Sequence, residues 1–287
     1  MLQITQKLYA MKKLLFLISF LFVYQLNAQD SWEDVKDAGK GSLQVAYLTE
    51  YPYAFTEHGS LVGIEIEILK TFQGWVNKRK EVELSLNFVP YKSFSAFYEA
   101  VLDEENSVGS GSVTITKDRE KEVVFSPEYL RNVTVLVTRS GVQTLSSYNE
   151  IPEVFEGMTA IVREGTTHEE ELKKIKAFYN NDMVVKYVDT KEEMKALLDN
   201  DSSHYYAMID LITCWRWMTR DKVDLKIHRI ATVKNESFGF VFNQNSDWKP
   251  LFDEFFTSGF GFTSTEEYVH ILNRYLGPEI IEDVKSK

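Results

Sequence analysis

Segments with the pattern of a buried strand alternate with segments of helical periodicity along most of this 287-residue chain. Residues 43–48 and 82–89 are short and apolar or alternating, which is typical of strands. Residues 61–79 begin with Leu-Val-Gly and then place apolar residues such as Ile64 and Ile68 three and four positions apart, which is typical of a helix. This alternation predicts an α/β fold built from layers of strands and helices.

A second unit with the same alternation of strands and helices begins near residue 139. Strands are predicted there at residues 158–162, 184–188, 206–210 and 238–242, and helices at residues 168–179, 191–199, 211–219, 248–257 and 265–276; a helix is also predicted at residues 93–104 of the first unit. Thr167 and Glu170 have the spacing of a capping box at the start of one of these helices. Ligands of such sheets bind beyond the carboxyl ends of strands, so the region of interest comprises Asp210, a loop at 109–119 and a loop at 165–168.

The first 28 residues have the pattern of a secretory signal peptide. Lys12 and Lys13 precede a ten-residue apolar run, Leu14 to Val23, and a small residue, Ala28, precedes a strongly polar stretch. A membrane-spanning anchor is disfavoured because it needs roughly twenty apolar residues. We therefore expect residues 1–28 to be removed near Ala28 and the protein to be periplasmic.

The chain is strongly acidic. Its formal charge is −11, and residues 1–28 contain three lysines and no acid, so the charge without them is −14. This charge gives no general attraction for nucleic acid or anionic membranes. Cys214 is the only cysteine, so no intramolecular disulfide can form, and its apolar surroundings favour a buried structural thiol over a nucleophile.

A segment rich in Gly and Ser, residues 107–114, is followed by a charged stretch that contains Arg119. Small residues allow a ligand to approach the backbone, Ser112 and Thr114 offer hydroxyl groups, and the planar guanidinium of Arg119 suits a carboxylate. Taken alone, the same residues also fit a glycine-rich turn before a solvated charged helix.

Several motifs in order along the chain resemble the family 3 periplasmic solute-binding proteins, which serve ABC transporters for polar amino acids. The residues that carry this resemblance are Tyr51-Pro-Tyr-Ala-Phe55 with Gly59 to Leu69, Thr114-Ile-Thr-Lys-Asp-Arg119, Val124-Phe-Ser-Pro-Glu-Tyr129, Gly165-Thr-Thr167 and Ala207-Met-Ile-Asp210. They span about residues 43–276. The resemblance implies a type II periplasmic-binding-protein-like fold, with two α/β lobes joined by a two-strand hinge and a ligand cleft between them. We expect one lobe at residues 29–138 plus 237–287 and the other at residues 139–236.

The resemblance also implies roles for individual residues. Arg119 corresponds to the residue that pairs with the ligand α-carboxylate, and Asp210 corresponds to the acid that receives the α-ammonium. The remaining expected contacts are backbone and hydroxyl groups of Gly111, Ser112 and Thr114, N–H groups of Thr166 and Thr167, and the rings of Tyr51 and Phe94. The expected function is capture of an amino acid or similar small zwitterion by a monomer that delivers it to a membrane permease, with no cofactor, metal or catalytic residue.

Two other functions fit the same resemblance. A cyclohexadienyl-dehydratase-like lyase on this fold needs a general acid or base in the cleft, for which Glu50 or Glu65 are candidates. A free-standing ligand sensor is the other alternative. Two residues near the expected site also have interpretations that involve no ligand. Glu50 fits a solvated carboxylate as well as a cleft residue, and His168 fits an exposed helix-start residue better than a ligand contact. Trp215 and Trp217 are expected in the core.

Overall fold

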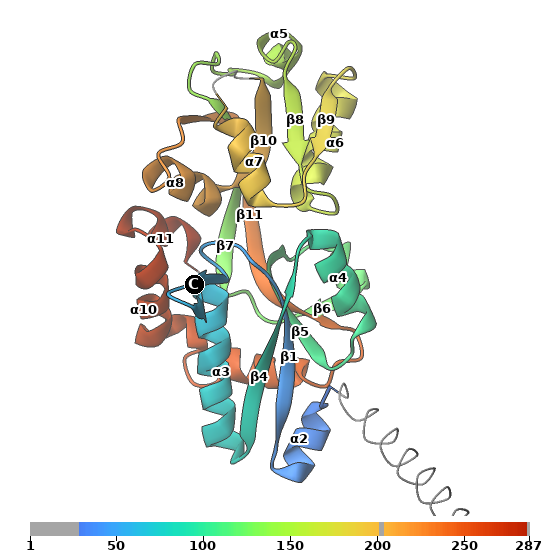
Figure 1. The fold of residues 1–287 in the computed structure, drawn as a ribbon, viewed down its shortest axis with the longest axis vertical. Helices are drawn as coiled ribbons and strands as arrows, with labels where there is room; N and C mark the ends of the chain where they lie inside the picture. The colour runs from blue at the N-terminus through green and yellow to red at the C-terminus, as the bar shows by residue number, and fades with distance from the viewer. Residues whose placement is uncertain (1–28, 201–203, 286–287) are drawn as a thin grey trace, which may run out of the picture.

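The computed structural model describes residues 29–200 and 204–285, and in this part of the chain it is a mixed α/β protein with an elongated outline and two stacked lobes (Figure 1). The predicted signal peptide lies outside the described residues. None of the helices in the described ranges is long and apolar enough to cross a membrane.

The larger lobe, at the bottom of Figure 1, contains both ends of the described chain. Its elements are α2 (Trp32–Ala38), β1 (Lys40–Leu48), β2 (Phe55–Glu57), β3 (Ser60–Val62), α3 (Ile64–Lys80), β4 (Glu83–Tyr91), α4 (Phe94–Asp103), β5 (Ser107–Thr114), the 3-10 helix η1 (Arg119–Lys121), β6 (Val123–Phe125), α9 (Lys249–Thr257), the 3-10 helix η3 (Phe262–Ser264), α10 (Glu266–Tyr275) and α11 (Pro278–Val284). The smaller lobe contains the 3-10 helix η2 (Tyr148–Glu150), α5 (Ile151–Val154), β8 (Thr159–Val162), α6 (Thr167–Tyr179), β9 (Val184–Tyr187), α7 (Lys191–Leu198), β10 (Tyr205–Asp210) and α8 (Leu211–Thr219).

Two long strands, β7 (Leu130–Arg139) and β11 (Leu225–Asn243), run through both lobes and pair antiparallel with each other. They join the two halves of one sheet, whose order is β4-β1-β5-β11-β7-β10-β8-β9. The pairs β1–β4 and β1–β5 in the larger lobe and β10–β8 and β8–β9 in the smaller lobe are parallel. Parallel strands direct their carboxyl ends to one edge, and in both lobes these edges face the cleft between them.

Each lobe has its own hydrophobic core. Leu130 on β7 and Phe238 on β11 pack in the core of the larger lobe, whereas Val135 on β7 and Ala231 on β11 pack in cores of the smaller lobe. The crossing between lobes therefore lies between these residues on each strand. The division expected from the sequence, residues 29–138 with 237–287 and residues 139–236, remains our proposal for the two lobes.

The predicted strands and helices are found close to their expected positions, with one local correction. The Gly/Ser-rich segment predicted as a loop from residue 109 is mostly strand β5, which is almost entirely buried. A Cβ atom at Gly109 would lie 2.5 Å from Val241 and 2.7 Å from Val101, and one at Gly111 would lie 3.0 Å from Phe97. The small residues thus allow close packing of helix α4 and strand β11 against β5, which a composition typical of turns does not reveal.

The prediction for Cys214 is confirmed, since its side chain is fully buried in the core of the smaller lobe. Trp217 packs in the same core, and Trp215 packs against the core of the larger lobe. The short helices α2 and α11 and the full length of β11 were not predicted.

Candidate functional site

A cavity of about 830 Å³ lies between the two lobes. Its walls come from residues 48–56 and 90–92 of the larger lobe and from residues 163, 189–192 and 216 of the smaller lobe. These segments follow the carboxyl ends of β1 and β4 on one side and of β8 and β9 on the other. The cavity therefore occupies the place where sheets of this topology bind ligands.

Glu50, which follows strand β1, connects the lobes through buried ion pairs. One carboxylate oxygen contacts the Arg163 guanidinium, and the other lies 2.9 Å from Nζ of Lys191; both cations belong to the smaller lobe. Burial would raise the pKa of Glu50, but Arg163 and Lys191 outweigh this effect and hold the pKa below its usual value. Glu50 is 6 % exposed, so the interpretation as a solvated carboxylate was wrong.

Asp210 ends strand β10 and is also buried among donors. Its Oδ2 lies 2.9 Å from Nζ of Lys191, and its Oδ1 accepts a hydrogen bond of 2.8 Å from the side-chain amide of Asn132. Nε2 of His168 lies 3.3 Å from Oδ1, although hydrogen-bond geometry is not met. Burial would raise the pKa of Asp210, but Lys191 and His168 hold it well below its usual value. His168 is 8 % exposed, so the expectation of an exposed helix-start residue was wrong.

Lys191 is the first residue of α7 and bridges the two acids. Its Nζ lies between Oε2 of Glu50 and Oδ2 of Asp210, and it also lies 3.4 Å from the Thr213 hydroxyl. Burial would lower the pKa of Lys191, but Asp210 and Glu50 raise it above its usual value. A cation of the protein itself is thus held against both buried acids of the cleft.

Arg119 crosses from the larger lobe to the smaller one at another point. It donates to the carbonyl oxygens of Thr114 and Gly165, each at 3.0 Å, and its guanidinium lies over the rings of Phe94 and Tyr98 at 5.0 and 5.7 Å. Burial lowers the pKa of Arg119, although not enough to remove its charge. Among the described residues no carboxylate lies within ion-pair distance of this guanidinium, so its charge is available to an anionic ligand.

Glu65 fixes the end of strand β5 beneath the cleft. Its carboxylate accepts hydrogen bonds from the Ser110 hydroxyl at 2.5 Å, from the backbone N–H of Ser112 at 2.7 Å and from the Tyr129 hydroxyl. Burial raises the pKa of Glu65, partly offset by these bonds. Ser112 has a φ of 47°, a left-handed conformation that its bond to Glu65 stabilises. We infer that Glu65 positions the segment that carries Gly111 and Ser112.

The family model of the bacterial extracellular solute-binding proteins, family 3, matches residues 43–278. This match covers most of the chain. The chain belongs to the family 3 solute-binding proteins. The resemblance seen in the sequence motifs is therefore confirmed by the match, and the two lobes, the crossing strands and the interlobe cavity are those of a type II periplasmic binding protein.

Solved structures share this family 3 fold at low sequence identity. An ancestral arginine-binding protein bound to arginine is 23 % identical, with a TM-score of 0.65 over 83 % of this chain and 99 % of that one. A substrate-binding protein of an ABC uptake transporter from Streptococcus pneumoniae with bound histidine is 18 % identical, with a TM-score of 0.70 over 88 % and 98 %. The GluR0 ligand-binding core from Nostoc punctiforme with L-glutamate is 16 % identical, with a TM-score of 0.65 over 82 % and 100 %. A search of curated protein sequences found no match.

Of the nine residues predicted to bind ligand in this family 3 protein, Tyr51 alone is among the described residues that line the interlobe cavity, and the ligand contacts of the other eight remain predictions. Thr166 is the N-cap of α6: its hydroxyl donates to the Arg163 carbonyl at 2.8 Å and accepts from the Glu169 N–H at 3.3 Å. The capping box predicted at Thr167 and Glu170 is therefore wrong by one residue, because the helix begins at Thr167 instead of after it. Thr167 is partly exposed at the first helical position.

Tyr51 and Phe94 both lie at the lobe boundary. Tyr51 lines the cavity and packs between the Phe55 ring, at 4.7 Å, and the Arg216 guanidinium, at 4.2 Å. Phe94 is 5 % exposed and lies under Arg119. Both rings thus hold an arginine in place in this structure, and ligand contact by either remains a prediction.

Arg163 and Lys191 were missed in the sequence. Arg163 follows the predicted strand at 158–162, and Lys191 begins a predicted helix, so both lie at strand or helix ends where functional residues gather. Their partners, Glu50 and Asp210, are 113 and 19 residues away. No local pattern indicates such pairs.

Three buried polar atoms in or beside this cluster make no hydrogen bond among the described residues: the Tyr53 hydroxyl, Oδ1 of Asn132 and Nε2 of His168. The Tyr53 ring lies 5.6 Å from Nζ of Lys191, and the charges of Asp210, Glu50 and Glu65 add to burial in raising the Tyr53 pKa. Asn132 already donates to Asp210. Buried polar groups without partners are rare, and at this place they are suited to hydrogen bonds with a ligand.

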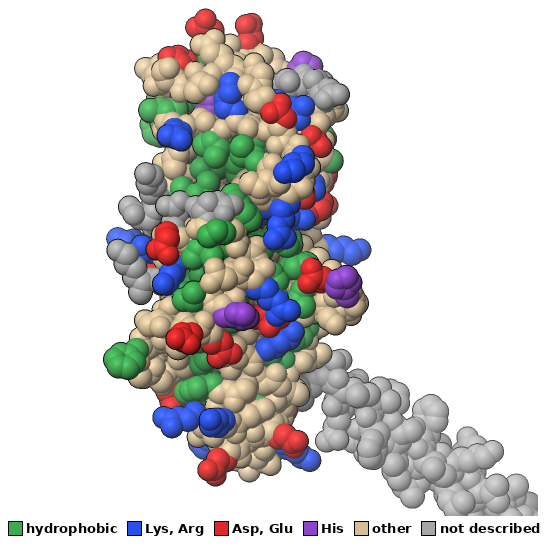
Figure 2. Space-filling model, turned by 90° about the vertical axis from the view of Figure 1, so that its left-hand side faces the viewer, with side chains coloured by type: hydrophobic (Ala, Val, Ile, Leu, Met, Phe, Trp, Pro, Cys, Tyr) green, Lys and Arg blue, Asp and Glu red, His purple; other side chains and the backbone are tan. Residues whose placement is uncertain are grey.

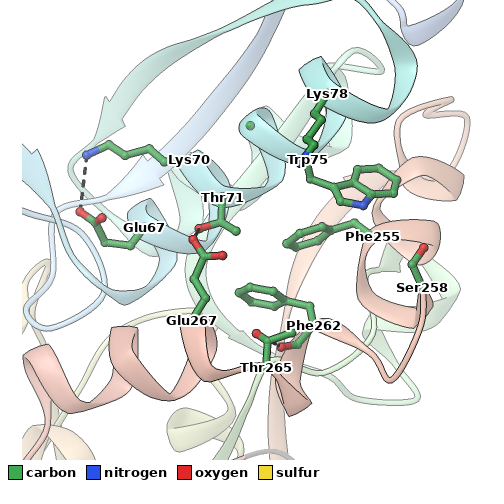
Figure 3. A pocket seen from close by; sticks show the side chains of 11 residues that line it. Glu67, Lys70, Thr71, Trp75, Lys78, Phe255, Ser258, Phe262, Thr265 and Glu267 are labelled. Atoms are coloured by element: carbon green, nitrogen blue, oxygen red, sulfur yellow. Dashed lines mark hydrogen bonds and ion pairs between the residues drawn. The ribbon is translucent and has the colours of Figure 1, made fainter.

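A second cavity, of about 590 Å³, lies on the larger lobe between α3, α9 and α10 (Figure 3). Trp75, Phe255 and Phe262 form its apolar wall, and an ion pair of 3.5 Å between Glu67 and Lys70 lies at its rim (Figure 3). All of its lining residues belong to one lobe, so the parting or approach of the lobes does not affect it directly.

Proposed function

We propose that this family 3 protein captures an amino acid between its two lobes outside the cytoplasm and delivers it to the membrane permease of an ABC transporter. The observation that carries the proposal is Arg119, a partly buried guanidinium that reaches both lobes and has no carboxylate partner among the described residues. A planar guanidinium binds a carboxylate through two parallel hydrogen bonds. The arginine, histidine and glutamate named with the solved relatives each carry an α-carboxylate, which supports this role.

The other predicted contacts complete the proposed site. Asp210 receives the α-ammonium, which requires Lys191 or His168 to give up one of its contacts with Asp210. The remaining contacts are the N–H groups of Thr166 and Thr167 at the start of α6, which favour a carboxylate, the backbone and hydroxyl groups of Gly111, Ser112 and Thr114, and the rings of Tyr51 and Phe94.

The hydrogen bonding of the cleft acids supports binding without chemistry. A lyase needs a carboxyl group that is free to exchange a proton with its substrate. Glu50 is committed to two cations and Glu65 to three donors. We therefore propose that neither acts as a general acid or base.

Isothermal titration calorimetry with the twenty amino acids tests the proposal. Charge-assisted hydrogen bonds contribute about 1.5–3 kcal/mol each, so Arg119→Ala should weaken binding at least tenfold. Asp210→Ala should also weaken it, whereas Arg79→Ala, a change at an exposed arginine on α3, should leave it unchanged. Normal binding by the Arg119 variant would show that the α-carboxylate binds elsewhere. Turnover of prephenate or arogenate by the purified protein would favour the lyase instead.

Export is the second part of the proposal. We expect the periplasmic protein to begin near Gln29 and to be a monomer, and mass spectrometry with light scattering of the exported protein measures both.

A further inference from the structure

The wall of the interlobe cavity is more basic than the rest of this acidic chain. The chain carries a net charge of −11. Yet four cations line the cavity, Lys92, Arg163, Lys191 and Arg216, against three acids, Glu50, Asp189 and Glu192. Outside this lining, Arg119 adds a further cation at the lobe contact and Asp210 a further acid beside Lys191. In the turned view, Lys and Arg side chains lie between the lobes as well as at the top and bottom of this face, interspersed with Asp and Glu (Figure 2). A cleft lined with an excess of one charge concentrates ligands of the opposite charge.

Arg163 has donors left over after it pairs with Glu50. Its guanidinium is 7 % exposed and lines the cavity, and Glu50 is the one side chain paired with it in the described part of the chain. A guanidinium carries five N–H donors. The donors that Glu50 does not use are therefore suited to a second carboxylate beside that of Glu50.

Lys191 disfavours a ligand with a basic side chain. It already bridges Glu50 and Asp210 with contacts of 2.9 Å to each acid. A ligand whose ammonium and basic side chain together displaced Lys191 from both acids would leave a buried lysine unpaired, and an unpaired buried charge is costly. The charges of Glu50 and Asp210 are thus already balanced by cations of the protein, so these acids do not need a basic ligand to pair with.

Arg119 and Arg163 are placed to bind two ends of one small molecule. Gly165, whose carbonyl accepts a hydrogen bond from Arg119, is two residues from Arg163 in the same turn. Arg119 therefore reaches the turn that carries Arg163, and the Arg163 side chain lines the cavity. Building on the proposed function, we propose that the cleft selects a small solute with two carboxylates, one bound by Arg119 and the other by Arg163 with Lys191.

Such a solute is an acidic amino acid or a simple dicarboxylate. Calorimetry of the purified protein with L-glutamate, L-glutamine, L-arginine and glutarate separates these cases. L-Glutamate should bind at least tenfold more tightly than its neutral isostere L-glutamine, and L-arginine should bind weakest. Glutarate that matches L-glutamate identifies a dicarboxylate, and glutarate that binds much more weakly identifies an acidic amino acid.

The ratio of the L-glutamine to the L-glutamate dissociation constants is the decisive quantity, because the cost of closing the lobes is common to both ligands and cancels. Arg163→Gln should lower this ratio about tenfold, since it removes a cation that only the acidic ligand uses. Glu50→Gln should raise it, since it removes an acid that competes for the same cations. A merely structural effect of either change would alter both ligands alike. Lys195→Gln, a change one turn further along α7 at a lysine paired with Asp221, is the matched control and should leave the ratio unchanged.

Other results would overturn the inference. If L-arginine or L-glutamine bound more tightly than L-glutamate, or if Arg163→Gln and Lys195→Gln gave the same ratio, the cleft would not select a second carboxylate, while the proposed amino-acid function would stand. If no amino acid and no dicarboxylate bound, the proposed function and this inference would both be wrong.

Discussion

Replacement of Glu50 by glutamine should release the contact between the lobes in the absence of ligand. The change keeps the size of the side chain but removes the charge that pairs with Arg163 and Lys191 across the cleft. Each charge-assisted contact contributes about 1.5–3 kcal/mol. Because Arg163 becomes exposed to water and Lys191 keeps its contact with Asp210 when the lobes part, we expect the lower end, a loss of about 3 kcal/mol from two contacts. This corresponds to a shift of about 100-fold from the closed toward the open arrangement.

Small-angle X-ray scattering measures this shift as an increase in the radius of gyration of the ligand-free protein. Glu57→Gln, a change at an exposed glutamate on β2, is the control and should leave the radius unchanged. The core clusters of the two lobes are separate, so we expect each lobe to stay folded in both variants. A Glu50→Gln protein as compact as the wild type would mean that the buried ion pairs do not hold the lobes together.

Three further outcomes are expected. The pKa of Glu50 is lowered in the folded protein, so the ionised Glu50 carboxylate contributes fully to stability above the usual value of 4.5. This contribution is lost as the pH falls through the lowered pKa. The difference in melting temperature between wild type and Glu50→Gln should therefore be largest at neutral pH and shrink in acid. Gly109→Ala places a Cβ atom 2.5 Å from Val241 and should lower the free energy of unfolding by about 1–3 kcal/mol in urea titrations, whereas Gly74→Ala, with open space around it, should be neutral or stabilising. Burial raises the pKa of Cys214 to about 12, so a thiol reagent at pH 8 should label it only after unfolding, and rapid labelling of the native protein would contradict its burial.

Much of the fold could be predicted because local patterns carry the information. The periodicity of residues 61–79 predicts helix α3, whose apolar face packs in the core of the larger lobe. Strand β5 was not predicted because its residues, Ser107–Thr114, have the composition of a turn. Their small size serves close packing against Phe97 and Val241, and only the tertiary structure reveals that neighbourhood.

The candidate site likewise has residues that could be predicted from the sequence and residues that could not. Arg119 and Asp210 could be predicted because each lies in a motif that resembles the family pattern. The cations that neutralise the cleft acids could not, because Arg163 meets Glu50 across 113 residues of sequence and lies in the other lobe. Burial of His168 against Asp210 was missed because these two residues of the smaller lobe are far apart in sequence and lie on different elements. Contacts between lobes depend on how two separately folded units pack against each other, and local patterns in the sequence do not indicate that packing.

The passage of β7 and β11 through both lobes has a consequence for the order in which the chain can fold. The core of the larger lobe combines Val35, near the start of the described chain, with Val284, near its end. The smaller lobe is formed from one continuous middle segment, so all of its contacts are available earlier during synthesis. The larger lobe must wait until the last helix has emerged, and its contacts span most of the chain, which slows folding. A chain that finishes its main core last stays unfolded longer, a condition that suits the export proposed above.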